Sequence, residues 1–532
     1  MKPPADRTRT RQREREARLD SNAAAGGLAA STEDPMPEQT PQSPSQRARG
    51  AAPDTEGPGL IEPCRYKLLS PISAGEGEDL LAGKSRADGL RRMQALLADW
   101  LRMENVVVLT AAGTSVSAGG RLMAGRRTNN LECLVLDAVQ RCALDQQTAA
   151  IIRHRMSRWP VEPDRGPTDF EAWLSYLFNA SELPKPAMSP IRAVRWQGRD
   201  AGGIDCEANP DAAAMQKLRT LIERAIFAEC ALEIDRRELS DPDGDATSGH
   251  IPFLAKLIAR DTNLGRTHLF TLNYDTLFEQ AMEELGVQYF DGFSGKTSAR
   301  FDPAVYGLDI YYPGDVAEGR VRRFDKFLQF YKLHGSIHWQ PDESGGVRAH
   351  HRDLGFVGQY RNADAAQKAA QLVSPHFGSI GPFGILPTSQ KFTQTLDMPY
   401  AHLFRLFHAR LNQPQTFLLV LGYGFGDDHV TRIIETALMN PSLVMLVVEP
   451  NPGSLIVERI QRYQRLGQRA FVLTERVKPG EGCSYKVATF ADFAQDIMPD
   501  VKWLDDYKRL RNFEEQLRKF DAPRSGEPAE TA

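Results

Sequence analysis

The chain has 532 residues, a formal net charge of −4 and an apolar content of 41%. These values are typical of a globular protein that buries a sizeable core, and they exclude a wholly disordered chain. No window approaches the roughly 18 to 20 uninterrupted apolar residues that a membrane-spanning helix requires, so we expect a soluble protein.

The N-terminal segment, residues 1–58, is rich in Pro, Ser, Ala, Arg and Glu and has few large apolar side chains. It cannot offset the entropy of ordering, so we predict a disordered tail. Arginine recurs at every second position from Arg7 to Arg15, but acidic residues interleave and no apolar h-region follows. This pattern favours a solvated tail over nucleic-acid contact and argues against a secretory signal, which leaves the cytoplasm as the expected compartment.

Helix and strand patterns alternate in the main domain, predicted over residues 59–500, beginning with apolar residues at helical spacing over 90–101. Strands are predicted over 106–110, 267–271, 327–333, 417–422, 443–448 and 470–474, and a helix over 276–285. Strands that alternate with helices predict an α/β fold with a Rossmann-like, mostly parallel sheet covered on both faces.

Residues 121–261 lack this alternation and indicate an inserted helical subdomain. A capping box from Thr168 to Glu171 predicts one helix start, and a long helix is predicted over 211–234. We also predict a C-terminal helix over 501–521 and a second disordered tail over 522–532.

The six cysteines are scattered, and no two stand at the two-residue spacing with which neighbouring thiolates share a zinc ion. This excludes a structural zinc ribbon, and we expect no metal. Such sparse usage fits reduced thiols that are buried as small hydrophobic side chains.

The first chemical motif is a small-residue turn after the strand at 106–110, with Gly113, Ser115, Ser117 and Gly119 as candidate residues. Such a turn allows a pyrophosphate to approach backbone N–H groups at a helix N-terminus. The spacing is not G-x-G-x-x-G, so a turn that only packs a helix on the sheet explains it equally well.

Three further motifs follow predicted strands. Asn273 and Asp275 come after the second strand, His334 follows the third, and a glycine-rich turn that ends in Asp427, Asp428 and His429 follows the fourth. Ligands bind open α/β sheets at such carboxyl ends, and histidine exchanges protons near neutral pH. Each motif also has a simpler explanation: a helix cap for the asparagine, a core histidine, and aspartates that favour a helix N-terminus.

Together the four motifs resemble the sirtuin pattern in chain order: a Gly/Ser-rich first turn, Thr-x-Asn-x-Asp, Leu-His-Gly and a late glycine-rich strand end. The Asn-Tyr-Asp, Leu-His-Gly-Ser and Gly-Tyr-x-Phe-x-Asp-Asp-His forms are closer to bacterial sirtuin-like NAD hydrolases of anti-phage defence. The resemblance covers about residues 104–474, and the helical insertion matches poorly.

The resemblance implies a role for each motif residue. Asn273 would hold the nicotinamide ribose and the attacking water, His334 would accept a proton at the ribose hydroxyls, and Asp275 would bind the nicotinamide carboxamide. The remaining residues implied to contact NAD are Gly113, Thr114 and Ser115 at the phosphates, Gly422 and Tyr423 at the adenosine, and Glu449 at the adenine ribose.

The chain departs from protein deacetylases of the family in three respects. Ala111 replaces the usual first glycine of the turn, which is tolerable if its φ stays negative. The Pro-Asp-Phe-Arg segment is replaced by residues 120–124, and the paired-cysteine zinc module is missing from the sequence. Deacylation needs a peptide cleft that these parts help to form, whereas hydrolysis of free NAD needs neither.

The leading hypothesis is therefore an NAD hydrolase that releases nicotinamide and ADP-ribose and depletes NAD in anti-phage defence. The alternatives are an NAD or ADP-ribose sensor without turnover, a protein deacylase or ADP-ribosyltransferase, and an assembly scaffold. The resemblance also implies homo-oligomers and a separately encoded HerA-class ATPase partner, since this chain has no G-x-x-x-x-G-K-[ST] motif.

Overall fold

The protein is known from a computed structural model. It describes residues 64–71, 78–121, 161–162, 166–167, 174–175, 212–239, 248–261, 263–297, 299–312, 323–342, 346–350, 355–377, 383–386, 388, 394–476 and 490–500. The predicted tails over 1–58 and 522–532, the capping box from Thr168 to Glu171 and the predicted helix over 501–521 lie outside the described residues.

A nine-stranded sheet organises the fold, in the order β2-β1-β15-β14-β13-β3-β6-β10-β7. The strands are β1 (Tyr66–Ser70), β2 (Glu78–Asp79), β3 (Asn105–Thr110), β6 (His268–Thr271), β7 (Gln288–Phe290), β10 (Phe327–Lys332), β13 (Thr416–Leu421), β14 (Val444–Val448) and β15 (Ala470–Glu475). Neighbours from β15 to β7 pair in parallel, whereas β1 pairs antiparallel with β15 and β2 with β1.

The strand order places a topological switch point between β3 and β13. From β3 the chain adds β6 and β10 on one side, and it then returns to place β13, β14 and β15 on the other side. Ligands bind open α/β sheets at such a point, outside the carboxyl ends of the strands. The predicted α/β fold with a mostly parallel sheet is confirmed, and all six predicted strands are present with ends within two residues of the prediction.

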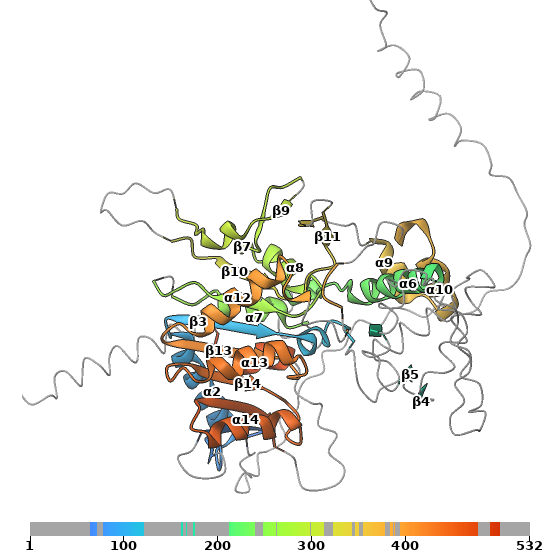
Figure 1. Cartoon of the computed structure of the whole chain (residues 1–532). Helices are drawn as coiled ribbons and strands as arrows, with labels where there is room; N and C mark the ends of the chain where they lie inside the picture. The colour runs from blue at the N-terminus through green and yellow to red at the C-terminus, as the bar shows by residue number, and fades with distance from the viewer. Residues whose placement is uncertain are drawn as a thin grey trace, which may run out of the picture. The chain divides into compact units, whose positions relative to one another are not determined.

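Helices cover both faces of the sheet (Figure 1). Side chains alternate along β3, so Val106 and Val108 join one apolar cluster while Val107 and Leu109 join the other. The first cluster includes apolar residues of α2 (Arg86–Leu101), α7 (His250–Leu257) and α8 (Leu277–Glu284). The second includes those of α12 (Tyr400–Leu411), α13 (Asp428–Ala437) and α14 (Leu455–Arg465).

Smaller elements surround this sheet. The strands β8 (Phe293–Ser294), β9 (Ala299–Phe301), β11 (Trp339–Pro341) and β12 (Val347–Ala349) form a four-stranded antiparallel sheet, and β4 (Val161–Glu162) pairs with β5 (Gly166–Pro167). Further helices are α6 (Ala212–Cys230), α9 (Gly355–Asn362), α10 (Ala365–Leu372) and α15 (Phe490–Asp492), with single turns η1 (Ala112–Ser115), η2 (Arg236–Leu239), η3 (Pro303–Gly307), η4 (Pro375–Phe377) and η5 (Phe493–Ile497).

The helix predicted over 211–234 is α6, and it ends at Cys230. The side chain of Gln280 on α8 binds the chain just beyond this end: its amide donates to the Leu232 carbonyl at 2.8 Å and accepts from the Ile234 N–H at 3.1 Å. This competing side-chain partner explains why the helix stops short of its predicted end.

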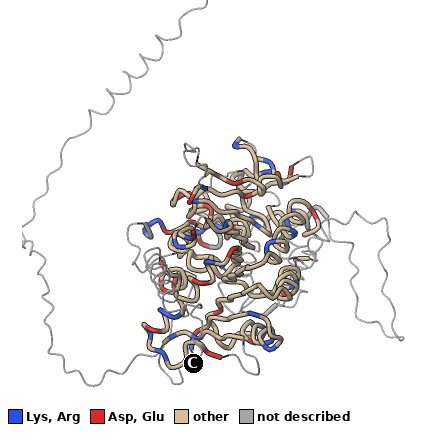
Figure 2. Tube along the Cα trace, turned by 90° about the vertical axis from the view of Figure 1, so that its left-hand side faces the viewer, with Lys and Arg blue, Asp and Glu red and all other residues tan. Residues whose placement is uncertain are grey.

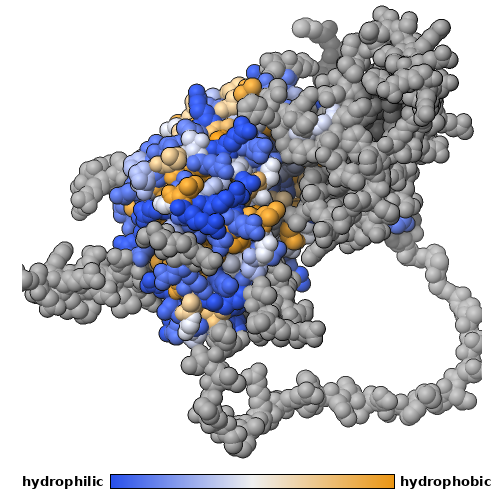
Figure 3. All heavy atoms as spheres, turned by 60° about the horizontal axis from the view of Figure 1, so that its bottom comes forward, coloured by the Kyte–Doolittle hydropathy of each residue, from blue (hydrophilic) through white to orange (hydrophobic). Residues whose placement is uncertain are grey.

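Basic and acidic residues are interspersed along the described elements (Figure 2). On the face shown in Figure 3, hydrophilic residues predominate and hydrophobic residues lie between them in smaller groups. Among the described helices, none combines the length and apolar character needed to cross a bilayer.

A buried imidazole makes the folding stability depend on pH. His250 is 0% exposed, and its ring centroid lies 4.7 Å from that of Phe278 and 5.0 Å from that of Phe490. Burial lowers the pKa of His250 from 6.5 to about 3. The unfolded chain therefore takes up a proton that the folded chain excludes, so the contribution to stability is complete above pH 6.5 and is lost as the pH falls toward 3.

We expect His250→Phe to weaken this pH dependence. Well below pH 6.5, the free energy of unfolding of the wild type should fall more steeply than that of the variant, by about 1.4 kcal/mol per pH unit. Denaturant titrations at pH 7 and pH 5 measure the difference. Equal slopes for the two proteins would contradict the assignment.

Candidate functional site

The four predicted motifs follow strands whose last residues lie side by side in the sheet. Leu421 of β13 pairs with Thr110 of β3, Thr110 pairs with Thr271 of β6, and Thr271 pairs with Lys332 of β10. These are the last residues of their strands. The segments that follow them therefore leave the same carboxyl edge of the sheet, at and beside the switch point.

The turns after β3 and β13 touch through their backbones. A Cβ on Gly113 would lie 2.6 Å from the Gly422 Cα, and one on Gly422, whose φ is +65°, would lie 2.6 Å from the Thr114 nitrogen. The Gly113 N–H donates to the Gly422 carbonyl at 3.0 Å, and the Thr114 N–H donates to the Ala111 carbonyl at 2.9 Å. Glycine is thus required at both positions because the two backbones lie too close for a side chain. The N–H groups of Gly113 and Thr114 are already used in hydrogen bonds of the turn.

Ala111 adopts an extended conformation with φ of −144°, so the condition under which an alanine is tolerated at this position is met. The turn continues as the single 3₁₀ turn η1, and the described residues of this segment end at Arg121. A phosphate-binding role for the segment from Gly113 to Ser115 remains a prediction, because its first two amides already have partners inside the protein.

Asn273 is 8% exposed and is bound to the β3 turn through its side-chain amide. The Nδ2 group donates to Ser115 Oγ at 2.8 Å, to the Ala111 carbonyl at 3.1 Å and to Thr114 Oγ1 at 3.2 Å. Among the described residues, none donates a hydrogen bond to Asn273 Oδ1. The N-cap of α8 is Thr276, so the alternative in which Asn273 only caps this helix is not supported.

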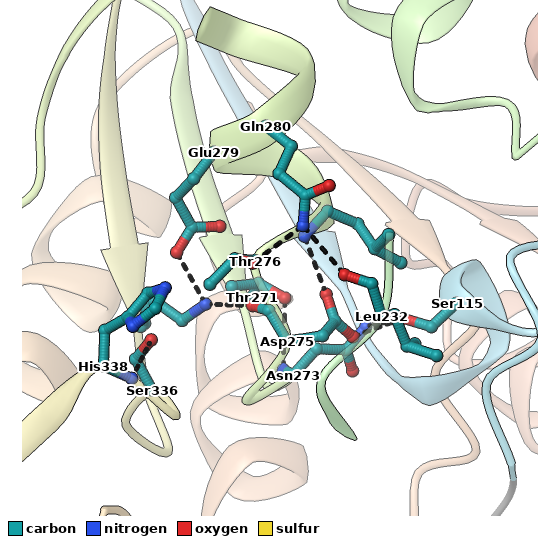
Figure 4. A network of polar contacts seen from close by, with 12 residues as sticks. Ser115, Leu232, Thr271, Asn273, Asp275, Thr276, Glu279, Gln280, Ser336 and His338 are labelled. Carbon is teal, nitrogen blue, oxygen red and sulfur yellow. Dashed lines mark hydrogen bonds and ion pairs between the residues drawn. The ribbon is translucent and has the colours of Figure 1, made fainter. Parts of the chain in front are cut away.

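Asp275 lies beside Asn273 and binds the same serine (Figure 4). Ser115 Oγ donates to Asp275 Oδ2 at 2.6 Å, and the Leu277 N–H donates to Asp275 Oδ1 at 3.2 Å. Burial raises the pKa of this carboxyl group, and the charge of Lys332 is the largest opposing influence. Each oxygen retains capacity for a further donor, since a carboxylate oxygen accepts two hydrogen bonds.

Lys332 is a buried cation behind this group. Its side chain is 3% exposed, and its ammonium lies 2.8 Å from Glu279 Oε1 and also donates to the main-chain carbonyl of Asp275. Burial raises the pKa of Glu279, and Lys332 opposes this shift. Because an ammonium is rarely buried without a partner, the pair of charges explains how the lysine is accommodated.

His334 is 6% exposed and faces a second histidine. Its Nε2 lies 3.1 Å from Nε2 of His429, which stands in the first turn of α13. The ring of Phe404 on α12 lies near both imidazoles, with centroids 6.3 Å from His334 and 5.1 Å from His429. In a hydrogen bond between two imidazoles, one nitrogen donates its proton and the other accepts it.

The loop that carries His334 is held by a second backbone crossing. Gly335 has φ of +97°, and a Cβ there would lie 2.6 Å from the Gly384 Cα. The Ile385 N–H donates to the His334 carbonyl at 2.8 Å, and the Ser336 N–H donates to the Phe383 carbonyl at 3.1 Å. These bonds fix the direction in which the imidazole leaves the end of β10.

The residues predicted to contact the adenosine lie further along the edge. Gly422 is exposed, but Tyr423 is only 5% exposed, and its hydroxyl donates to the Asp427 carbonyl at 2.9 Å. Glu449 follows β14 and is partly buried, which raises its pKa, and its Oε1 accepts from the Asn451 N–H at 2.9 Å. A contact between Tyr423 and a nucleotide would therefore come from its backbone.

The structure brings Ser115, Asn273 and Asp275 into one hydrogen-bonded group and places His334 on the neighbouring strand end. Sequence reasoning missed Lys332 and Glu279. The available signal was a lysine at the end of a mainly apolar strand pattern. The part played by His429 was also missed, although its motif was recognised. Within the described residues, no three His, Cys, Asp or Glu side chains are grouped as a metal site.

Comparison with known proteins identifies one domain. A family model described as a SIR2-like domain matches residues 267–466. The match contains Asn273, Asp275, His334 and the turn after β13, and it begins after the β3 turn. No curated protein matches the chain. The chain thus contains a SIR2-like domain, which suggests an NAD-related activity and makes an NAD-dependent enzyme the expected class.

Proposed function

We propose that this SIR2-like domain hydrolyses NAD, cleaving the bond between nicotinamide and ribose to release nicotinamide and ADP-ribose. The observation that carries the proposal is the orientation of Asn273. Both hydrogens of its amide face acceptors of the β3 turn, so its carbonyl oxygen is left for a ligand or a water molecule. His334 stands at the end of the adjacent strand as a proton acceptor.

The proposed reaction depends more on the orientation of the substrate and the attacking water than on acid catalysis. When the bond between the pyridinium nitrogen and ribose C1′ breaks, nicotinamide takes the bonding electron pair and leaves as a neutral molecule, while positive charge develops on the sugar. Water then adds its oxygen to C1′ and loses a proton. Asn273 Oδ1 accepts a hydrogen bond from this water, which places its oxygen toward C1′.

His334 takes part as the base of the reaction. It accepts a proton from a ribose hydroxyl or from the attacking water at one ring nitrogen, and it can release the proton on its Nε2 to Nε2 of His429, 3.1 Å away. Asp275 accepts from the nicotinamide carboxamide with the lone pairs that Ser115 and the Leu277 N–H leave unused. The turns at Gly113 and Gly422 bring the dinucleotide against the backbone at the switch point.

The resemblance to anti-phage NAD hydrolases supports further parts of the proposal. These are depletion of NAD in the bacterial cytoplasm during defence, assembly into homo-oligomers, and control by a separately encoded HerA-class ATPase. The test of activity is therefore run with and without such a partner.

The test incubates the full chain with NAD and follows nicotinamide and ADP-ribose by chromatography. We expect equimolar release of both products without any acetylated peptide. His334→Gln should lower the rate by at least roughly 100-fold, because a positioned general base typically contributes that much. His408→Gln, which changes an exposed histidine on α12, is the control and should keep the wild-type rate.

The other functions give different results. Release that requires an acetyl-lysine peptide would identify a deacylase, and transfer of ADP-ribose to protein would identify a transferase. Binding of NAD with no release, even with the partner present, would identify a sensor. Equal rates for the wild type and a folded His334→Gln variant would remove His334 from the proposed mechanism.

A further inference from the structure

A charged side chain that the proposed reaction does not use lies directly behind the candidate site. Lys332 is the last residue of β10, two residues before His334, and its side chain is 3% exposed. It binds Glu279 of α8 at 2.8 Å and the main-chain carbonyl of Asp275. A cation from one strand end thus holds the segment that follows the neighbouring strand.

A continuous series of bonds leads from this cation to the proposed reacting group. The ammonium binds the Asp275 carbonyl, and the Asp275 carboxylate accepts from Ser115 Oγ at 2.6 Å. Ser115 Oγ in turn accepts from Asn273 Nδ2 at 2.8 Å. Figure 4 shows Ser115, Asn273 and Asp275 together, with Glu279 on the helix beside them. A shift of the Asp275 peptide would therefore reach the Asn273 amide through two side-chain hydrogen bonds.

We propose that Lys332, paired with Glu279, is a positioning residue for nicotinamide release: it anchors the segment from Asn273 to Asp275 so that the Asn273 carbonyl oxygen stays aimed at the reacting sugar. The inference rests on the proposed NAD hydrolysis. It assigns the lysine no contact with the substrate.

Stability alone gives little reason to bury this pair. Removing two charges from water is costly, and a buried ion pair can often be replaced by apolar residues with little or no loss of stability. A lysine that also binds the main chain of the active-site segment has a second effect, because it controls geometry. Misplacement of a reacting group by about 1 Å costs roughly 100-fold in rate.

The charge of Lys332 also acts on Asp275. The polar groups that bear on this carboxylate are the Ser115 hydroxyl from η1, the Leu277 N–H and the Glu279 carboxyl group from α8, Lys332 from β10 and the Cys230 thiol from the end of α6. Burial raises the pKa of Asp275 and Lys332 opposes that shift. Without the lysine the pKa of Asp275 rises further. When the pH is lowered, an activity that needs the carboxylate should therefore begin to fall at a higher pH than in the wild type.

The decisive variant is Lys332→Met/Glu279→Met in the full chain. It removes both charges of the pair, so neither is left buried without its partner. We expect the wild-type melting temperature, an almost unchanged dissociation constant for NAD, a kcat lower by roughly 100-fold, and an acid limb of the kcat profile displaced to higher pH. Lys332→Met/Glu279→Gln, which also removes both charges and keeps the volume of the second side chain, is the second variant, with changes in the same directions.

The matched control is Arg266→Met/Asp309→Asn. Arg266 likewise binds a carboxylate, that of Asp309 at 2.7 Å, and it also binds main-chain carbonyls. It precedes β6, so it lies at the amino ends of the parallel strands, away from the candidate site. Its removal should leave kcat and the pH profile unchanged.

The outcomes separate the inference from the proposed function. A wild-type chain that releases nicotinamide, together with a folded double variant of unchanged kcat and pH profile, overturns the positioning role and leaves NAD hydrolysis standing. If the Lys332→Met/Glu279→Met variant does not fold, an unchanged kcat in Lys332→Met/Glu279→Gln overturns the role in the same way. A wild-type chain that binds NAD and never releases nicotinamide overturns both.

Discussion

Asn273→Ala is expected to lower nicotinamide release by roughly 100-fold to 1,000-fold, the range seen when one preorganised polar group is removed from an active site. The variant loses the carbonyl oxygen that orients water and leaves acceptors of the β3 turn without their donor. The dissociation constant for NAD should change much less than kcat, because the contacts proposed for the phosphates and the adenosine involve other residues. Initial rates at several NAD concentrations measure kcat and KM separately.

Asn273→Asp is the sharper form of this test because it keeps the shape of the side chain. One carboxylate oxygen would replace the Nδ2 group and face the Ala111 carbonyl at about the same 3.1 Å, so two acceptors would meet where a donor and an acceptor met before. We expect a loss of activity as large as that of Asn273→Ala and a lower melting temperature.

Asn263→Ala, in an exposed turn before β6, is the control for replacing an asparagine and should behave as the wild type. A folded Asn273→Ala variant with the kcat of the wild type would refute the proposed role of this residue.

Gly113→Ala is expected to impair NAD binding and stability together. The added Cβ would lie 2.6 Å from the Gly422 Cα, which is backbone and cannot swing away as a flexible side chain could. The turns after β3 and β13 must then separate, at a cost of about 1–3 kcal/mol for such overpacking. Because the two turns meet at the switch point, we expect the dissociation constant for NAD to rise by at least roughly tenfold.

Gly422→Ala should give the same result for two reasons. Its Cβ would lie 2.6 Å from the Thr114 nitrogen, and the φ of +65° disfavours an alanine by about 1–2 kcal/mol. Gly424→Ala is the matched control in the same loop, since its added Cβ would meet no heavy atom of the described residues within 4 Å, apart from its own chain neighbours. Calorimetric titration with NAD and denaturant unfolding distinguish the three variants. Wild-type affinity in Gly113→Ala would show that the close contact is dispensable.

The match to the SIR2-like family begins at residue 267, so it excludes the β3 turn with Gly113 and Ser115. The structure nevertheless joins this turn to the matched segment through the bond from Asn273 to Ser115 and the contact between Gly113 and Gly422. We therefore expect the site to extend beyond the matched residues to the turn that follows β3.

Much of the fold could be predicted because its signals are local. Each buried parallel strand is a short run of β-branched and other apolar residues, and each is followed by small or polar residues at the end where ligands bind. The order of motifs along the chain was enough to predict an α/β sheet and to select Asn273, Asp275 and His334. Local patterns also located the helix before β3 and the one after β6.

The long-range contacts could not be predicted from local patterns. Nothing in the sequence near Lys332 states that its ammonium reaches the carbonyl of Asp275, 57 positions earlier, or that His334 faces His429, 95 positions later. The hydrogen bonds of the Gly113 and Thr114 amides could not be predicted either, since the turn that contains them is fixed by β13 pairing beside β3.

The sequence by itself determined which residue types stand at the ends of the strands, because strand and turn propensities act over a few neighbouring residues. Only the tertiary structure decided which of those side chains bind one another. Strand order and register place Asn273 against Ser115 and bury Lys332 beside Glu279, and both depend on packing between segments that are far apart in the chain.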